Sequence, residues 1–368
     1  MTQVLSPLTI TALRDLVGAE DPVASVYLGL QPQYPTLDSA EDLDLRWRAL
    51  VARLAEQHAD EATVAAVTGR LAATGPAPSE LAVFAAPGRI LLEQPIPGGA
   101  RFDRAGFAAP AALLPLLDWW QRHPAYLVVI TDRTGADVVA VPQGTTHGAV
   151  KTVIGPDDEI ERNAPGGWAQ ARYQRRAEDS WRHNAAAVAL TTARALRHLR
   201  AGLLLVAGDV RAVQLLSDDL APLRQRGLTI RRLPGGRAPD GSAANRAAAV
   251  TAEVERYTAH QTDALLAALA RHAGPRGTAV HGAQASLAAL AAGQVQTLFV
   301  ADRAGDERPA WFSPGTLCAV RAGSPGARRG RLVDVAVRAA LLTHAEIRVV
   351  PPGTVPGDVA ALCRFHTG

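Results

Sequence analysis

Apolar and polar residues follow two different spacings in the first third of the chain. Ile10, Leu13 and Leu16 recur at helical spacing after a start signal at residues 6–9, which predicts a helix. The proline of His123-Pro124 predicts a domain boundary. Between these points we predict a strand, an amphipathic helical stretch, two short strands and an apolar segment, in the order 24–30, 43–73, 80–85, 88–93 and 110–120.

In the rest of the chain, runs with strand character alternate with runs of helical spacing, which implies an α/β layered fold. Run 203–208 is apolar throughout, as buried parallel strands are. A Pro- and Gly-rich linker at 233–242 completes a division into three predicted domains, 1–122, 123–240 and 241–368. The predicted strands are 126–131, 136–141, 203–208, 296–300 and 346–350, and the predicted helices are 168–200, 210–220, 245–273, 284–292 and 332–343.

Nearly all of the basic side chains in the sequence are arginines. The net charge of the 368 residues is only +3, yet Lys151 is the sole lysine. Arginine contacts phosphate in bidentate fashion and stacks on bases, so its local concentration matters more than the net charge. No apolar run reaches the ~18 residues that span a membrane, and no leader segment is visible. Cys318 and Cys363 are expected to be buried thiols in a reducing compartment, which predicts a cytoplasmic protein.

Motifs for metal, nucleotide and nucleophile chemistry are missing from the sequence. The histidines have neither the HExxH pattern nor another close metal-ligand spacing. Gly235-Gly236 lacks the lysine of a P-loop and the GxGxxG spacing, and neither Ser180 nor Ser313 lies in a GxSxG elbow. We therefore expect no metal and no cofactor, and the sequence favours a binding protein over an enzyme.

The densest chemistry lies in residues 161–176, where a Pro-Gly-Gly turn leads directly into a helix. Glycines allow close backbone approach to a partner, and free N–H groups at a helix start suit phosphate. Tyr173, Ala177, Trp181, Ala185 and Val188 recur at the spacing of a face that packs on a core. The predicted RNA-binding residues of the tip and helix are Gly166, Gly167, Trp168, Gln170, Arg172, Arg175, Arg176 and Arg182.

A plainer interpretation is a solvated helix face beside an ordinary loop, because charged surface helices are common. The doublet Arg328-Arg329 together with Arg331 presents the same choice. We interpret it as a solvated loop, with a second RNA or protein contact as the alternative.

The stretch from Gly166 to Arg176, running on to Asn184, resembles the central loop and helix of eukaryotic and archaeal class-one release factors. In that family a Gly-Gly-Gln tip precedes a helix with the same arginine-aromatic-arginine pattern. Residues 289–300 resemble its helix, glycine and strand "ALxxGAVxTLLI", residues 360–365 its closing "AILRF", and residues 234–237 its Gly-Gly linker. The match covers roughly 126–365 and is similar to the bacterial branch, which includes Pelota-like hibernation factors of actinobacteria.

The resemblance implies a central release-factor-like α/β domain followed by an L30e/L7Ae-like α/β sandwich. It further implies a monomer that binds the ribosomal A site, its tip reaching toward P-site tRNA, with an elongation-factor GTPase docking on the last domain. Residues 1–122 carry no motif that the resemblance explains.

The chain departs from the family at the position after Gly-Gly. Release factors place a hydrolytic water there through glutamine, whereas this chain has Trp168, with Gln170 two residues on. We therefore expect occupancy of the ribosome without hydrolysis, in hibernation or rescue. Trp168 then stacks on a base or packs at the start of its own helix. The alternatives are a peptidyl-tRNA hydrolase that uses Gln170 and an RNA-binding stress protein that acts off the ribosome.

Overall fold

The computed structural model describes residues 8–19, 21–31, 39–75, 77, 79–97, 103–154, 167–237, 243–274, 277–303, 305–316, 319–320 and 322–365, without the side chains of 167–179 and 243. The chain forms two compact units, one of Met1–Gln121 with Gln261–Gly368 and one of Arg122–His260. The helix α8 (Ala243–Arg271) contains the second boundary between them. We call these unit 1 and unit 2. The predicted α/β, multidomain class is confirmed, while the division into three domains stays a prediction.

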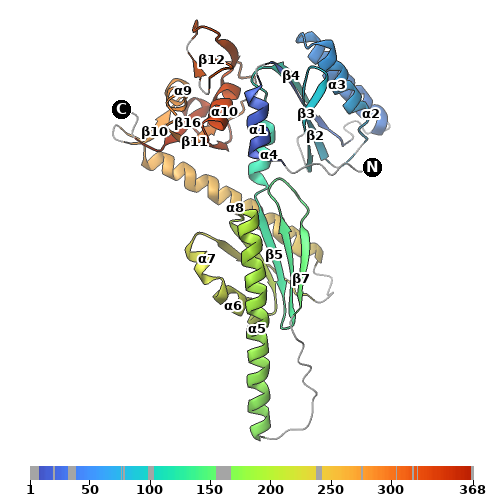
Figure 1. The fold of residues 1–368 in the computed structure, drawn as a ribbon, viewed down its shortest axis with the longest axis vertical. Coiled ribbons are helices and arrows are strands. Elements are labelled where there is room, and N and C mark those ends of the chain that lie inside the picture. Colours follow the sequence, from blue (N-terminus) through green and yellow to red (C-terminus); the bar gives the residue numbers. More distant parts are fainter. Residues whose placement is uncertain are drawn as a thin grey trace. The chain divides into compact units, whose positions relative to one another are not determined.

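The first part of unit 1 is an antiparallel sheet in the order β3-β2-β1-β4, covered by helices on both faces (Figure 1). Alternate residues of a strand point to opposite faces, so Val26 and Leu28 meet α2 and α3 while Tyr27 belongs to the core around α1. The elements are α1 (Ile10–Gly18), β1 (Val23–Gly29), α2 (Ser39–Glu56), α3 (Glu61–Ala72), β2 (Ser79–Ala86), β3 (Arg89–Pro97), β4 (Arg104–Ala108) and α4 (Leu114–Arg122).

The last part of unit 1 holds a mixed sheet, β10-β16-β11-β15, and a small antiparallel sheet, β13-β12-β14. Strands β11 and β15 run parallel, and β16 lies antiparallel between β10 and β11. The elements are β10 (Ala279–His281), α9 (Ala283–Ala291), β11 (Val295–Val300), β12 (Pro309–Phe312), β13 (Ala319–Val320), β14 (Arg328–Arg331), α10 (Leu332–Leu342), β15 (Glu346–Val349), the 3-10 turn η1 (Pro356–Asp358) and β16 (Val359–Cys363).

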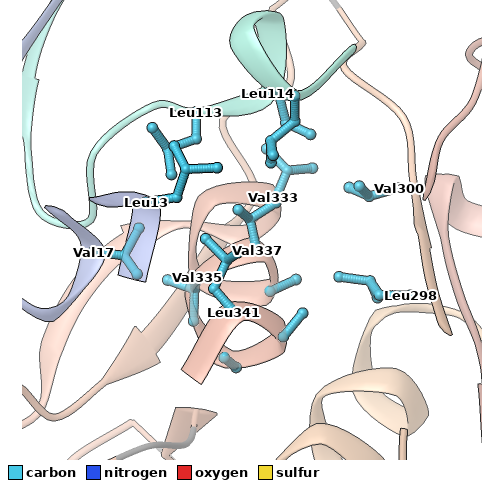
Figure 2. Packing of buried hydrophobic residues seen from close by; sticks show 14 of the residues in the cluster. Leu13, Val17, Leu113, Leu114, Leu298, Val300, Val333, Val335, Val337 and Leu341 are labelled. Atoms are coloured by element: carbon cyan, nitrogen blue, oxygen red, sulfur yellow. The ribbon is translucent and has the colours of Figure 1, made fainter. Parts of the chain in front are cut away.

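The two ends of the chain share one hydrophobic core in unit 1. Figure 2 shows Leu13 and Val17 of α1, and Leu113 and Leu114 at the start of α4, converging on α10 and β11. Every residue of α10 from Leu332 to Leu341 is buried, so this helix lies inside the core and not along its edge. Residues more than 300 positions apart, such as Val17 and Val333, are therefore buried together, which no local pattern in the sequence indicates.

Unit 2 is a five-stranded sheet in the order β7-β6-β5-β8-β9. Strands β5, β8 and β9 are parallel, while β6 and β7 continue antiparallel from β5. Helices α5 and α6 cover one face, and residues 249–257 of α8 cover the other. The elements are β5 (Tyr126–Thr131), β6 (Gly135–Val141), β7 (Ala149–Ile154), α5 (Gly167–Leu199), β8 (Leu203–Gly208), α6 (Val210–Asp219), α7 (Ala221–Gln225) and β9 (Thr229–Arg232).

Several predictions of local structure are corrected. The stretch 43–73 is two helices, because the chain turns at His58 (φ +61°) and Asp60 caps α3 by accepting from the Thr63 amide at 2.8 Å. Residues 328–331 are strand β14 and not a loop. Cys363 is a buried free thiol as predicted, and Cys318 lies outside the described residues. No helix in the described ranges is long and apolar enough to cross a membrane.

Candidate nucleic-acid interface

The predicted RNA-binding segment is built on α5, which is 33 residues long and begins at Gly167. At 1.5 Å per residue it is about 50 Å in length. Its second half is anchored on the sheet, since Ala185, Val188 and Leu196 are buried in the core of unit 2. In Figure 1 the first half of α5 extends past the end of this sheet. The helix and its predicted core face are confirmed for residues 185 and 188, while the side chains of Tyr173 and Ala177 lie outside the described residues.

The backbone places the predicted cationic residues on the extending half. Arg172, Arg175 and Arg176 occupy positions i, i+3 and i+4 of continuous helix, so they share one helix face. Trp168 and Gln170 lie in the first turn. Gly166 lies outside the described residues, and Gly167 is the first helical residue. Arg182 is exposed, two positions before the buried Asn184.

The base of the extending half is held by the turn that follows β5. The guanidinium of Arg133 lies over the ring of Trp181, 4.6 Å from its centroid, a cation–π contact. Asn184, which is 3% exposed, donates from Nδ2 to the Arg133 carbonyl at 3.0 Å. Arg133 also lies 3.7 Å from the carboxylate of Asp209, the cap of α6. Trp181 was predicted to pack on the core, and its ring face instead contacts an arginine in the turn between β5 and β6.

A second arginine joins the residues after β9 to the turn after β5 and to the start of β6. Arg237 donates from Nε to Asp137 at 3.0 Å and from Nη1 to Asp132 at 3.2 Å. The hydrogen bond from Arg237 lowers the pKa of the Asp137 carboxyl, against a smaller opposing effect of burial. Burial acts to raise the pKa of Asp132, but the hydrogen bonds from Thr134 and the charge of Arg237 outweigh it, so this pKa is also lowered. With Leu233 buried, residues 233–237 of the predicted linker belong to the fold of unit 2.

The chain matches a described family over this unit. The profile of bacterial archaeo-eukaryotic release factor family 2 matches residues 125–275. Over these residues the chain is similar to that family. The release-factor resemblance predicted from Gly166 to Asn184 is thereby confirmed for the segment that carries α5 and the Arg237 contact.

Relatives and solved structures give further likenesses. The uncharacterized proteins MT2704 and Rv2629, from two strains of Mycobacterium tuberculosis, are each 28% identical over 217 residues, which is 58% of this chain and 56% of the relative. The chain thus spans about half the length of these relatives. A structure of ribosome-bound archaeal Pelota with ABCE1 is 14% identical, with 98% and 94% of the chains covered and a TM-score of 0.41. Dom34 of S. cerevisiae is 9% identical, with 76% and 74% covered and a TM-score of 0.38. At these scores the structural likenesses carry no inference about function.

Within the release-factor segment, the structure brings only part of the predicted site together. Six of the predicted residues fall on one helix, from Gly167 to Arg176, with Arg182 farther along. The sequence reading missed Arg133 and the pair Asp132 and Asp137, which hold the base of α5 and the residues after β9. The signal available was the Asp-Arg-Thr-Gly turn directly after a parallel strand, since such strand ends gather side chains from several elements. No cluster of three or more metal-ligating side chains is found in the described ranges.

Proposed function

We propose that this chain binds the ribosomal A site and acts by occupancy, as a hibernation or rescue factor, without hydrolysing peptidyl-tRNA. The observation that carries the proposal is α5. The helix begins at the Gly-Gly pair, places Arg172, Arg175 and Arg176 on one face, and lies within the release-factor segment. Arginines clustered on one helix face suit bidentate contacts with the phosphates of a nucleic-acid backbone.

The anchoring of α5 supports a reaching role. From Gly167 to Asn184, the first buried residue among the side chains of α5 that the structure describes, the helix covers about 25 Å at 1.5 Å per residue. The buried second half and the contacts of Arg133 with Trp181 and Asn184 hold the helix axis against the sheet. Because one end of the helix is held in this way, the orientation of its axis is fixed, and its first turn can contact a partner at a distance from the sheet.

The residue after Gly-Gly supports occupancy without chemistry. An indole has one N–H donor and no acceptor, so Trp168 cannot position an attacking water as an amide does. Its ring suits stacking on an unpaired base, worth about 1–3 kcal/mol. P-site tRNA and an elongation-factor GTPase on the last part of the chain are the partners that we propose by family analogy.

Co-sedimentation with 70S ribosomes, paired with release of a labelled peptide from P-site peptidyl-tRNA, tests the proposal. We expect binding without release. Replacement of Arg172, Arg175 and Arg176 by glutamine is expected to weaken binding and to lower its dependence on log salt by about 2–3, because each lost phosphate contact removes ~0.7–0.9. The matched control replaces Arg194 and Arg197, exposed on the anchored half of the same helix, and should leave binding unchanged.

Each alternative has a distinct outcome in the same assays. Peptide release that disappears in Gln170→Ala would identify a hydrolase and overturn the occupancy proposal. Binding to free RNA with no sedimentation of ribosomes would identify an RNA-binding protein that acts off the ribosome. Equal loss of binding in the control and the triple variant would remove α5 from the argument, since general charge would then explain the affinity.

A further inference from the structure

A cleft of about 700 Å³ lies in unit 1, far along the chain from α5. It is formed by the end of α2, by β4, by β14 and by the segment between β11 and β12. Small-molecule sites occupy ~300–1,000 Å³, so its size suits a ligand such as a mononucleotide. Gln57 accepts a hydrogen bond from the Phe107 amide at 2.7 Å, which ties the end of α2 to β4 on one wall of the cleft.

Arginines dominate the lining of this cleft. Asp302 accepts hydrogen bonds from Arg104, at 2.7 Å, and from Arg331, so these cations are partly neutralised. Arg53 and Arg329 are exposed, and no ion pair of either is found within the described ranges. The charged side chains of the lining are Arg53, Arg104, Arg303, Arg329 and Arg331 with Asp302, Glu307 and Asp334. Positive charge therefore remains for an anionic ligand.

A buried carboxyl group lines the same cleft. The Asp334 side chain is 7% exposed, and its nearest cation, Nη1 of Arg331, lies 3.9 Å from Oδ2, beyond hydrogen-bond distance. Its other oxygen, Oδ1, has no hydrogen-bond partner in the described part of the chain. Burial raises the pKa of Asp334 to about 7, with Arg331 opposing and Asp302 and Glu307 adding to the shift. A buried polar group without a hydrogen bond is costly, and a ligand hydroxyl or amino group would satisfy it.

Close packing beside the cleft depends on a glycine between two of its arginines. A Cβ on Gly330 would lie 2.9 Å from the Pro110 ring and 2.9 Å from a Val335 methyl group. Gly330 thus lets β14, with Arg329 and Arg331 on either side, lie against the connection from β4 to α4. The half-buried ring of Phe107 also lines the cleft, and an aromatic ring offers a stacking surface for a base.

We propose that this cleft binds a free nucleotide, with its phosphate on Arg53 and Arg329 and a hydroxyl or amino group of its nucleoside donating to Asp334. The combination of arginines, an aromatic ring and a buried acceptor matches the three chemical parts of a nucleotide. The carboxylates Asp302 and Glu307 in the same lining disfavour a long RNA backbone, which would pass close to them. This site is independent of the ribosome-binding role proposed for α5.

Isothermal titration calorimetry of the full chain with ADP and with GDP tests the proposal. We expect saturable binding of one molecule per chain for at least one of the two. Arg53→Gln and Arg329→Gln should each weaken it about tenfold, because charge-assisted hydrogen bonds to phosphate are strong. Arg48→Gln is the matched control, since Arg48 is on the same helix as Arg53 but pairs with Asp44 outside the cleft, and it should change nothing.

Further measurements distinguish nucleotide binding from a loss of folding and from RNA binding. Asp334→Asn should weaken binding of the nucleoside diphosphate while leaving the weak binding of inorganic phosphate unchanged, which a loss of folding would not do. Absence of binding for both nucleotides would overturn the proposal, and so would equal binding in Arg48→Gln and Arg329→Gln. Binding of a single-stranded RNA oligomer that Arg329→Gln abolishes, without binding of either nucleotide, would assign the cleft to RNA and overturn it as well.

Discussion

Helices α2 of unit 1 and α5 of unit 2 carry arginines in similar sequence contexts, yet the arginines have different environments. On α2, Arg46 is 7% exposed, pairs with Asp42 at 3.0 Å and Asp103 at 2.7 Å, and donates to two backbone carbonyls. On the anchored half of α5, Arg194 and Arg197 are exposed. Helical spacing gives the face on which an arginine lies, but only the tertiary fold shows whether that face is covered.

Of the variants considered, we expect replacement of Arg46 to lower the free energy of unfolding most. Arg46→Met leaves Asp42, which is 0% exposed, and Asp103 without their cation. An uncompensated buried charge is costly, so we expect the free energy of unfolding to fall by about 3–5 kcal/mol in urea titrations followed by circular dichroism. Arg48→Met, two positions away in a pair that is mostly exposed, should cost less than about 0.5 kcal/mol. Similar losses in both variants would contradict the distinction between covered and open arginines.

Replacement of the buried carboxyl group of Asp334 should have the next largest effect on the free energy of unfolding. This change should stabilise the chain, whereas the loss of Arg46 destabilises it. A raised pKa means that the charged form is disfavoured in the folded state, so Asp334 should lower stability as pH rises from about 4, its unfolded pKa, to about 7. One pKa unit corresponds to ~1.4 kcal/mol, so Asp334→Asn should stabilise the chain by about 2–4 kcal/mol at pH 8. At pH 4 the two proteins should differ little. Urea titrations across this pH range test it, and a constant difference would show that charge is not the cause.

A smaller effect on stability is expected where Arg237 pairs with the turn after β5 and the start of β6 in unit 2. The pKa values of Asp132 and Asp137 are lowered, so their stabilisation is present above about pH 4 and is lost as pH falls through the folded values. Arg237 is 22% exposed, and solvent screens part of its pairing. We expect Arg237→Gln to cost about 1–2 kcal/mol at pH 7 and less at pH 3. Thermal unfolding at both pH values measures it, and a loss that grows toward pH 3 would contradict the assignment.

Local patterns predicted the long elements well. The helix of α5, the apolar strand β8 and the helix of α10 all follow from helical spacing or from apolar runs within each segment. Short strands escaped, including β4, β9 and β14, because four or five residues such as Arg328–Arg331 show no alternation and are stabilised by partners distant in the sequence. The core that the two chain ends share could not be predicted from the sequence either, because α1 and α10 are joined by tertiary packing alone.

The two candidate sites also differ in how far the sequence predicts them. The tip and helix of unit 2 were predicted because all their residues lie within one short segment around Gly167 and Arg172. The cleft of unit 1 combines Arg53, Arg104 and Asp334, which are separated by 51 to 281 positions and follow no motif. A site assembled across the chain leaves no spacing to detect. Asp334 in particular reads in the sequence as an ordinary acidic residue at a helix start, and only its burial distinguishes it.

Replacement of Arg133 tests whether this residue holds α5 where the helix begins to extend past the sheet, and its effect on stability should be small. Arg133 contacts the Trp181 ring and accepts a hydrogen bond from Asn184 through its backbone carbonyl. Arg133→Gln removes the cation–π contact but keeps the carbonyl, so the free energy of unfolding should fall by only about 0.5–1 kcal/mol. Hydrogen exchange should then quicken in the turn of α5 around Trp181 and stay unchanged near Leu196. Arg194→Gln, an exposed change on the same helix, should alter neither region. If Arg133→Gln left exchange around Trp181 unchanged, the Asn184 hydrogen bond and the buried face beyond it would suffice to orient α5, and the arginine contact would have no part in holding the helix.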